Sequence, residues 1–114
     1  MSGITTHVLD TARGEPARGL RVTLQRVDVG GIVTTIGVQT TDDDGRARRL
    51  VPDHDKVAVG WYRLSFESGA YLRALGVTPF FPVVTIDFEV SDASADYHLP
   101  LLLSPFGYST YRGS

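Results

Sequence analysis

The chain has 114 residues, of which 42% are hydrophobic, and it carries a net charge of −2 at pH 7. This length and apolar content predict one folded domain over residues 1–114 with a core of its own, and they exclude an intrinsically disordered chain. The slightly negative charge argues against a nucleic-acid-binding protein, and the absence of cysteine excludes disulfides and thiolate metal sites.

Hydrophobic residues recur mainly with a period of two, which is typical of strands with one buried and one solvated face. Such alternation predicts strands in residues 20–25, 62–66 and 84–90. Turn residues lie between the alternating segments: Gly30-Gly31, Asp44-Gly45, Pro52-Asp53 and Ser91-Asp92. Short alternating strands at this spacing predict an all-β, antiparallel sandwich or barrel.

One segment departs from the period of two and predicts a short helix near residues 68–76. Ser68 is a candidate N-cap and Gly76 a candidate stop. The apolar side chains of this segment would share one face over about two turns: they are Tyr71, Leu72 and Leu75.

The C-terminal run, residues 104–114, is polar, aromatic and cationic and follows the apolar residues 99–103. Its Tyr-Ser-Thr-Tyr core, residues 108–111, favours a strand, and the run has little of the composition typical of disorder. Arg112 lies close to the terminal carboxylate of Ser114, after a hydrophobic strand. This combination indicates part of a functional site.

The histidines lie in different settings. In the N-terminal β-branched run, alternation places Thr5 and His7 on one side of a strand. His98 shares a face with Leu102 if its neighbours Leu99 and Leu101 point to the core, which suggests an interface or a cleft. His54 lies in a polar turn, and a solvated role is the simpler interpretation there. Taken alone, a strand histidine is more often structural, and Asp44-Gly45-Arg46 is usually a hairpin turn with a solvated arginine.

Several catalytic motifs are missing from the sequence. There is no His-Glu-x-x-His, no glycine-rich phosphate loop and no Gly-x-Ser-x-Gly. A metal site built from His7, His98 and a third ligand stays open. No apolar run approaches the length of a membrane span, and residues 1–7 lack the basic and apolar regions of a signal peptide. We therefore expect a cytoplasmic protein with no membrane partner.

Five segments, read together, resemble one known family. They are residues 4–11 (Ile-Thr-Thr-His-Val-Leu-Asp-Thr), 14–17 (Gly-Glu-Pro-Ala), 44–46 (Asp-Gly-Arg), 97–103 (Tyr-His-Leu-Pro-Leu-Leu-Leu) and 111–114 (Tyr-Arg-Gly-Ser). They resemble the opening, the central motif and the C-terminal signature of the 5-hydroxyisourate hydrolases, which are transthyretin-related proteins. Asp96 departs from the pattern, because many members carry a further histidine there. The resemblance implies a transthyretin-like antiparallel β-sandwich of about seven or eight strands with one short helix near residues 68–76.

The same scaffold resembles transthyretin itself, a thyroid-hormone carrier. The carrier has Lys, Glu and Thr at the positions of His7, Arg46 and His98, and small apolar residues in place of residues 111–114. All four differences place this chain with the hydrolases. A carrier of a small aromatic ligand without catalysis is the alternative, while a purely structural sandwich would leave these residues unexplained.

The resemblance implies an enzyme that hydrolyses 5-hydroxyisourate to 2-oxo-4-hydroxy-4-carboxy-5-ureidoimidazoline in urate degradation, by histidine-assisted attack of water on a ring amide carbonyl. The implied catalytic residues are His7, Arg46, His98 and Ser114. The implied substrate-binding residues are His7, Arg46, Tyr111, Arg112, Gly113 and Ser114. We expect His98 with Ser114 to activate water while Arg46 and His7 hold the substrate, although the two histidines can exchange roles.

Tyr111 and Arg112 serve either the substrate or the placement of the chain, and the sequence leaves this open. We expect no metal and no cofactor. The family forms a dimer of dimers, and a final strand at a sheet edge would offer unpaired backbone groups to a partner. The resemblance therefore implies a homotetramer, with Leu101 to Leu103 supplying apolar surface.

Overall fold

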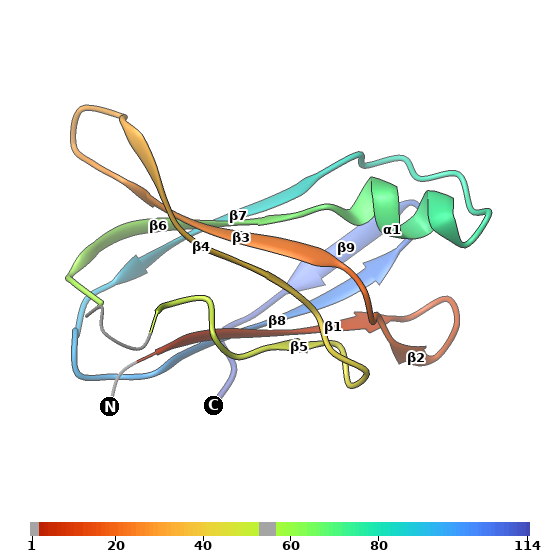
Figure 1. Cartoon of the computed structure of the whole chain (residues 1–114), viewed down its shortest axis with the longest axis horizontal. Coiled ribbons are helices and arrows are strands. Elements are labelled where there is room, and N and C mark those ends of the chain that lie inside the picture. The colour runs from red at the N-terminus through yellow and green to blue at the C-terminus, as the bar shows by residue number, and fades with distance from the viewer. Residues whose placement is uncertain (1–2, 53–56) are drawn as a thin grey trace.

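The computed structural model describes residues 3–52 and 57–114. Its strands form two stacked sheets, with one short helix at one end (Figure 1). The first sheet has the order β2 (Glu15–Pro16), β1 (Ile4–Asp10), β8 (Tyr97–Ser104) and β9 (Gly107–Thr110), and β5 (Arg46–Ala47) also pairs with β1. The second sheet has the order β4 (Val33–Thr40), β3 (Arg21–Val27), β6 (Gly60–Phe66) and β7 (Val84–Val90). The predicted all-β sandwich is confirmed.

Alternation along the strands sends one set of side chains into the space between the sheets. In β1, Val8 is buried while Thr5 and His7 on the other face are partly exposed. The same alternation buries three side chains of β6 as predicted: Tyr62, Leu64 and Phe66. The outward face of β1 is therefore free to carry polar chemistry on a rigid support.

The pairing of β1 with β8 is parallel, whereas the other strand pairs in the described ranges are antiparallel. Parallel neighbours cannot be joined by a tight hairpin, and here nearly the whole chain forms the connection. Strand patterns in the sequence do not reveal which strands pair, so this exception to the antiparallel prediction has no local signal. The register sets Thr5 opposite His98.

The predicted turn at Asp44-Gly45 is confirmed and connects directly to β5. Gly45 has a φ of +76°, a conformation that side-chain-bearing residues rarely adopt. A Cβ at Gly45 would also collide with the backbone oxygen of Val8. Gly31, in another predicted turn, has a φ of +83°. Asp53 of the predicted Pro52-Asp53 turn, and His54, lie outside the described residues.

The predicted helix is α1 (Ser68–Ala74), but its start differs from the prediction. Glu67 occupies the N-cap position and makes no side-chain capping bond. Ser68 is instead a buried helical residue, and its hydroxyl donates to the Phe81 carbonyl oxygen at 3.1 Å. The N-cap prediction for Ser68 was therefore wrong, because this hydroxyl connects the helix to the following loop.

The predicted apolar face of α1 is only partly buried. Tyr71 and Leu72 pack in the core, while Leu75 is 41% exposed and lies beyond the last helical residue. Gly76, with a φ of +76°, follows the helix end as expected for a stop. The Tyr71 hydroxyl donates to the buried Asp10 carboxylate at 2.8 Å and thereby connects α1 to β1.

The C-terminal run forms β9 at the edge of the first sheet, as its composition predicted, but the strand ends at Thr110. The chain then runs on alongside β8 in the same register, and Gly113 forms an isolated antiparallel bridge with His98. Within the described residues, no helix combines the length and the apolar character needed to cross a membrane.

Candidate active site

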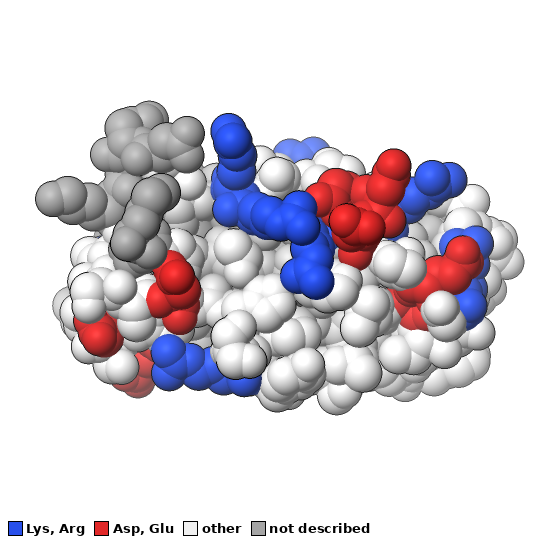
Figure 2. Space-filling view, turned by 90° about the horizontal axis from the view of Figure 1, so that it is seen from below, with Lys and Arg blue, Asp and Glu red and all other residues white. Residues whose placement is uncertain are grey.

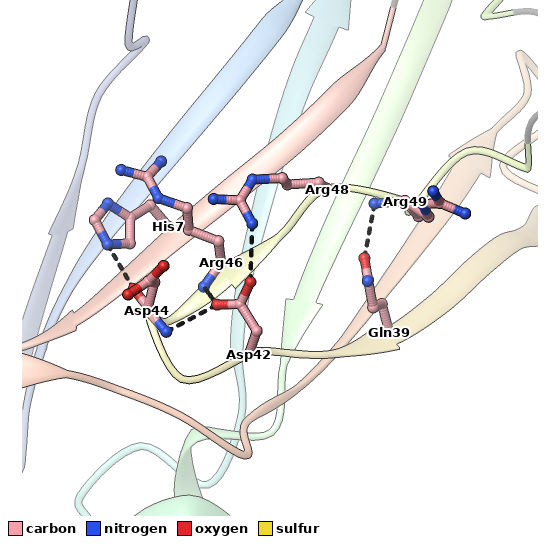
Figure 3. A network of polar contacts seen from close by, with 7 residues as sticks. All are labelled: His7, Gln39, Asp42, Asp44, Arg46, Arg48 and Arg49. Atoms are coloured by element: carbon pink, nitrogen blue, oxygen red, sulfur yellow. Dashed lines mark hydrogen bonds and ion pairs between the residues drawn. The ribbon is translucent and has the colours of Figure 1, made fainter.

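His7 and Arg46 are direct neighbours on the first sheet because β1 and β5 pair at these two residues. Their side chains lie on the outward face, close to the turn before β5 (Figure 3). His7 Nε2 lies 2.8 Å from the Asp44 carbonyl oxygen. A carbonyl oxygen only accepts, so Nε2 carries the proton of this bond. The neutral His7 ring therefore keeps its lone pair on Nδ1.

The turn before β5 holds Arg46 in place through the Asp42 carboxylate. One oxygen of Asp42 accepts the backbone N–H groups of Asp44 and Arg46, both at 2.9 Å. The other accepts Arg48 Nη1 at 2.9 Å. The Arg46 N–H contributes most to lowering the pKa of Asp42, with smaller contributions from Asp44 and Arg48.

The guanidinium of Arg46 has no acceptor among the described residues, unlike that of Arg48. Its opposite neighbour, His7, is a base rather than an acid and does not neutralise it. An unpaired cation on a rigid strand can bind the oxygens of a planar ligand in a forked geometry.

His98 lies on the neighbouring strand β8 and is half-buried. Its Nδ1 lies 2.8 Å from the Thr5 hydroxyl across the parallel pair. Burial of the ring, followed by the charges of Arg46 and His7, lowers the pKa of His98 below its ordinary value. The ring is therefore neutral at pH 7 and can accept a proton through its free nitrogen.

The C-terminal residues complete an open pocket of about 390 Å³ on this face. Side chains from four segments of the chain line it, among them Thr5, Arg46, Arg48, Asp96, His98 and Ser114. The Gly113 N–H donates to the His98 carbonyl oxygen at 2.7 Å, which holds the last residues beside β8. The pocket thus joins a neutral imidazole, an unpaired guanidinium and a hydroxyl.

Tyr111 and Arg112 lie elsewhere. Both line a second, mainly apolar pocket of about 230 Å³ between β7 and the β8–β9 edge. The Arg112 guanidinium carbon lies 4.6 Å from the ring centroid of Tyr97, a cation–π contact. Of the two roles left open by the sequence, this placement favours packing of the chain for Tyr111 and Arg112.

Charges on the side of the first sheet are mixed. Figure 2 views the molecule from this side and shows blue and red side chains in adjoining groups, with broad uncharged areas between them. In the described part of the chain, no three His, Asp or Glu side chains gather in a way that could hold a metal ion.

Sequence reasoning missed five lining residues: Gly3, Thr5, Thr6, Arg48 and Asp96. Alternation did place Thr5 on the face of His7, but only the parallel pairing of β1 with β8 brings it to His98. Asp96 stands out in the sequence as a departure from the family pattern and not as a site residue. Nothing local in the sequence distinguishes Arg48 from a solvated arginine.

Comparison with known proteins identifies the family of the chain. The model of the HIUase/Transthyretin family matches residues 4–113. A 5-hydroxyisourate hydrolase of Caulobacter vibrioides is 51% identical over 118 residues, with 100% of both chains covered. The structure of the Klebsiella pneumoniae 5-hydroxyisourate hydrolase has a TM-score of 0.87 at 35% identity, covering 100% of both chains. Sea bream transthyretin, solved in complex with thyroxine, has a TM-score of 0.90 at 30% identity, covering 97% of this chain and 94% of its own. The chain belongs to the HIUase/Transthyretin family.

Proposed function

We propose that this protein hydrolyses 5-hydroxyisourate to 2-oxo-4-hydroxy-4-carboxy-5-ureidoimidazoline. The observation that carries the proposal is a neutral His98 beside an unpaired Arg46 in one open pocket. Relatives with this activity in their names match the chain over its full length, with 51% identity in the Caulobacter vibrioides protein.

The substrate is flat, rich in carbonyl groups and partly anionic, and it needs donors and a cation. Arg46 supplies a planar fork of N–H donors that no described protein group occupies. Arg48 adds positive charge at the pocket wall, although its pairing with Asp42 reduces its effect. Arg46 is therefore the group we assign to the substrate oxygens.

His98 acts as the general base in this proposal. It takes a proton from water while the water oxygen forms a bond to the ring amide carbonyl carbon. Negative charge develops on the carbonyl oxygen, where Arg46 stabilises it. The C–N bond of the ring then breaks, and the leaving nitrogen receives the proton from His98. Protons balance, so the step needs no other reactant.

His7 and Ser114 hold the reacting groups in this mechanism. The Nε2–H of His7 is bound to Asp44, so His7 offers its Nδ1 to a substrate N–H group. Ser114 lines the pocket with His98, and its hydroxyl orients the attacking water. Exchange of the two histidine roles is the alternative mechanism, and we prefer His98 as the base because it lines the pocket together with Ser114.

An ultraviolet assay tests the activity. Urate oxidase generates 5-hydroxyisourate from urate, and the spontaneous decay of the product is followed with and without the protein. We expect acceleration by the wild type, and a loss of roughly 10²- to 10⁴-fold in His98→Asn and Arg46→Ala. Unchanged spontaneous decay with the wild-type protein would contradict the proposal and favour a carrier.

We also propose that the protein assembles as a homotetramer, a dimer of dimers. β9 lies at a sheet edge. Leu101 and Leu103 are buried in the core, so the expectation that they supply apolar surface was wrong, but the outward face of the first sheet carries the partly exposed Leu9 and Leu102. Such a face is suited to a second copy across the pocket. Light scattering at micromolar concentration tests this, and a fully active monomer would contradict it.

A further inference from the structure

The imidazole of His98 is bracketed on two opposite edges by Thr5 and Gly113, neither of which is among the implied catalytic residues. On one edge, the Thr5 hydroxyl lies 2.8 Å from Nδ1. On the other, Gly113 packs against Cδ2, the carbon bonded to Nε2. The Gly113 N–H also donates to the His98 carbonyl oxygen at 2.7 Å, so the same residue fixes both the backbone and the ring.

The contact with Gly113 leaves no room for a side chain. A Cβ built at this position would lie 2.6 Å from His98 Cδ2 and 3.3 Å from Cγ. Real Cβ atoms almost never approach another heavy atom that closely, so the ring would have to move. Gly113 has no positive φ, so the backbone conformation does not require glycine at this position. Glycine is needed here because a side chain would collide with the His98 ring.

The contact with Thr5 gives the ring a direction. A 180° flip of the imidazole would place Cδ2 against the Thr5 hydroxyl and Nδ1 against Gly113, and the hydrogen bond would be lost. When Nδ1 carries the proton and donates it to Thr5, the lone pair of the ring lies on Nε2. A second group that orients a catalytic histidine commonly fixes the reactive tautomer in this way.

We propose that Thr5 and Gly113 are positioning residues that clamp the His98 ring with its Nε2 lone pair towards the pocket. Thr5 accepts the Nδ1 proton, and Gly113 closes the opposite edge. Neither residue touches the reacting atoms. This inference rests on the proposed function for its kinetic consequences, but the ring orientation and tautomer can be measured without any substrate.

Matched variants separate the clamp from general damage. Gly113→Ala adds a Cβ against the ring, while Gly107→Ala adds one in the same C-terminal run where the nearest atom, Ser104 Oγ, is 3.7 Å away. Thr5→Val removes the hydroxyl at nearly constant shape, and Thr5→Ser keeps it. Circular dichroism and thermal unfolding identify the variants that fold.

The ring is observed by two-bond ¹H–¹⁵N NMR of the histidine side chains, assigned with His7→Asn and His54→Asn. We expect one dominant tautomer with Nδ1 protonated for His98 in the wild type, Gly107→Ala and Thr5→Ser. Thr5→Val should give a mixture of tautomers, and Gly113→Ala should shift the ring signals. In the ultraviolet assay, kcat should fall roughly 10- to 100-fold in Gly113→Ala and about tenfold in Thr5→Val, with a much smaller change of KM.

The clamp is contradicted if the His98 signals and kcat of Gly113→Ala equal those of Gly107→Ala, or if Thr5→Val keeps the wild-type tautomer. If Gly113→Ala does not fold, the comparison of Thr5→Val with Thr5→Ser decides. A wild type that does not hydrolyse 5-hydroxyisourate would contradict the proposed function alone, because the NMR comparison still tests the clamp. An active wild type with unaffected variants would contradict the clamp alone.

Discussion

Two arginines on the outward faces of the two sheets have opposite environments. Arg63 on β6 lies opposite Asp87 on β7, and the pair forms two hydrogen bonds of 2.7 and 3.1 Å. Arg46 on β5 lies opposite His7 on β1, and its guanidinium has no acceptor among the described residues. The two positions follow the same strand alternation, so the fold does not explain the difference.

The difference distinguishes an arginine that stabilises a sheet from an arginine that lines the candidate site. In the second sheet Arg63 and Asp87 satisfy each other: Asp87 raises the pKa of Arg63, and Arg63 lowers that of Asp87. In the first sheet the Arg46 guanidinium has no acceptor among the described residues, and its charge contributes to lowering the pKa of His98. The feature that indicates a site is therefore the missing partner of Arg46, and not the mere presence of an arginine in a sheet.

The largest expected effect is deletion of residues 111–114. This removes Ser114 from the pocket and Gly113 from His98, while the core between the sheets stays complete. Turnover should fall by roughly 10²-fold or more, and the circular dichroism spectrum should keep its β-sheet form. Full activity after the deletion would show that the candidate site does not need residues 111–114.

The comparison of the two arginines is sharpened by conservative substitution. Arg46→Lys keeps the charge but loses the planar fork, so kcat/KM should fall about 10- to 100-fold, the equivalent of one charge-assisted hydrogen bond. Arg63→Lys is the matched control and should leave kcat/KM unchanged. Equal effects of the two substitutions in the ultraviolet assay would contradict the assignment of different roles to Arg46 and Arg63.

Loss of a buried hydrogen bond away from the pocket should lower the stability of the protein. Tyr71→Phe removes the hydroxyl that donates to the buried Asp10 carboxylate, and the free energy of unfolding should fall by about 1–3 kcal/mol. Burial and this hydrogen bond raise the pKa of Tyr71 to about 12, so the phenol stays a donor at neutral pH. Tyr108→Phe is the control, because Tyr108 is 43% exposed and its change should stay within about 0.5 kcal/mol. Denaturant unfolding measures both.

The smallest expected effect is a pH dependence from His98. Burial, Arg46 and His7 hold its pKa below 6.5, while Arg48 and the Asp96 carboxylate face the same pocket. The base is neutral above this pKa, so the acidic limb of kcat/KM should lie below pH 6.5.

The same shift predicts a pH dependence of stability. The unfolded chain binds the His98 proton more readily, so stability should fall as pH drops from 6.5 towards the folded-state pKa. His98→Asn should lose this part of the stability profile, and an acidic limb above pH 6.5 would contradict the assignment.

Local patterns predicted the elements well because each depends on neighbouring residues. Alternation identified β3, β6 and β7, and the glycine at position 45 identified the turn before β5. The same reasoning failed at Ser68, because its hydroxyl bonds to the distant Phe81 and not to the helix N-terminus. The parallel partner of β1 was also unpredictable, since strand pairing is decided by the packing of the whole sandwich.

The candidate site was predicted through resemblance more than through physical pattern. Taken alone, His7 and His98 were most simply structural histidines, and Arg46 a turn residue. The motifs of the family brought them together, and the pocket contains Arg46 and His98 with Ser114. What no motif supplied was the contact between Thr5 and His98, because it depends on register across a parallel pair.

The parallel pairing of β1 with β8 has a consequence for the way the protein is made. Thr5 and His98 are 93 positions apart in sequence, and the bridge from His98 to Gly113 closes still later. A ribosome has therefore to release almost the whole chain before the pocket can close, while the β3–β4 hairpin can form much earlier. Such non-local contacts are slow to form. Newly synthesised chains should form the second sheet first and the pocket around His98 last.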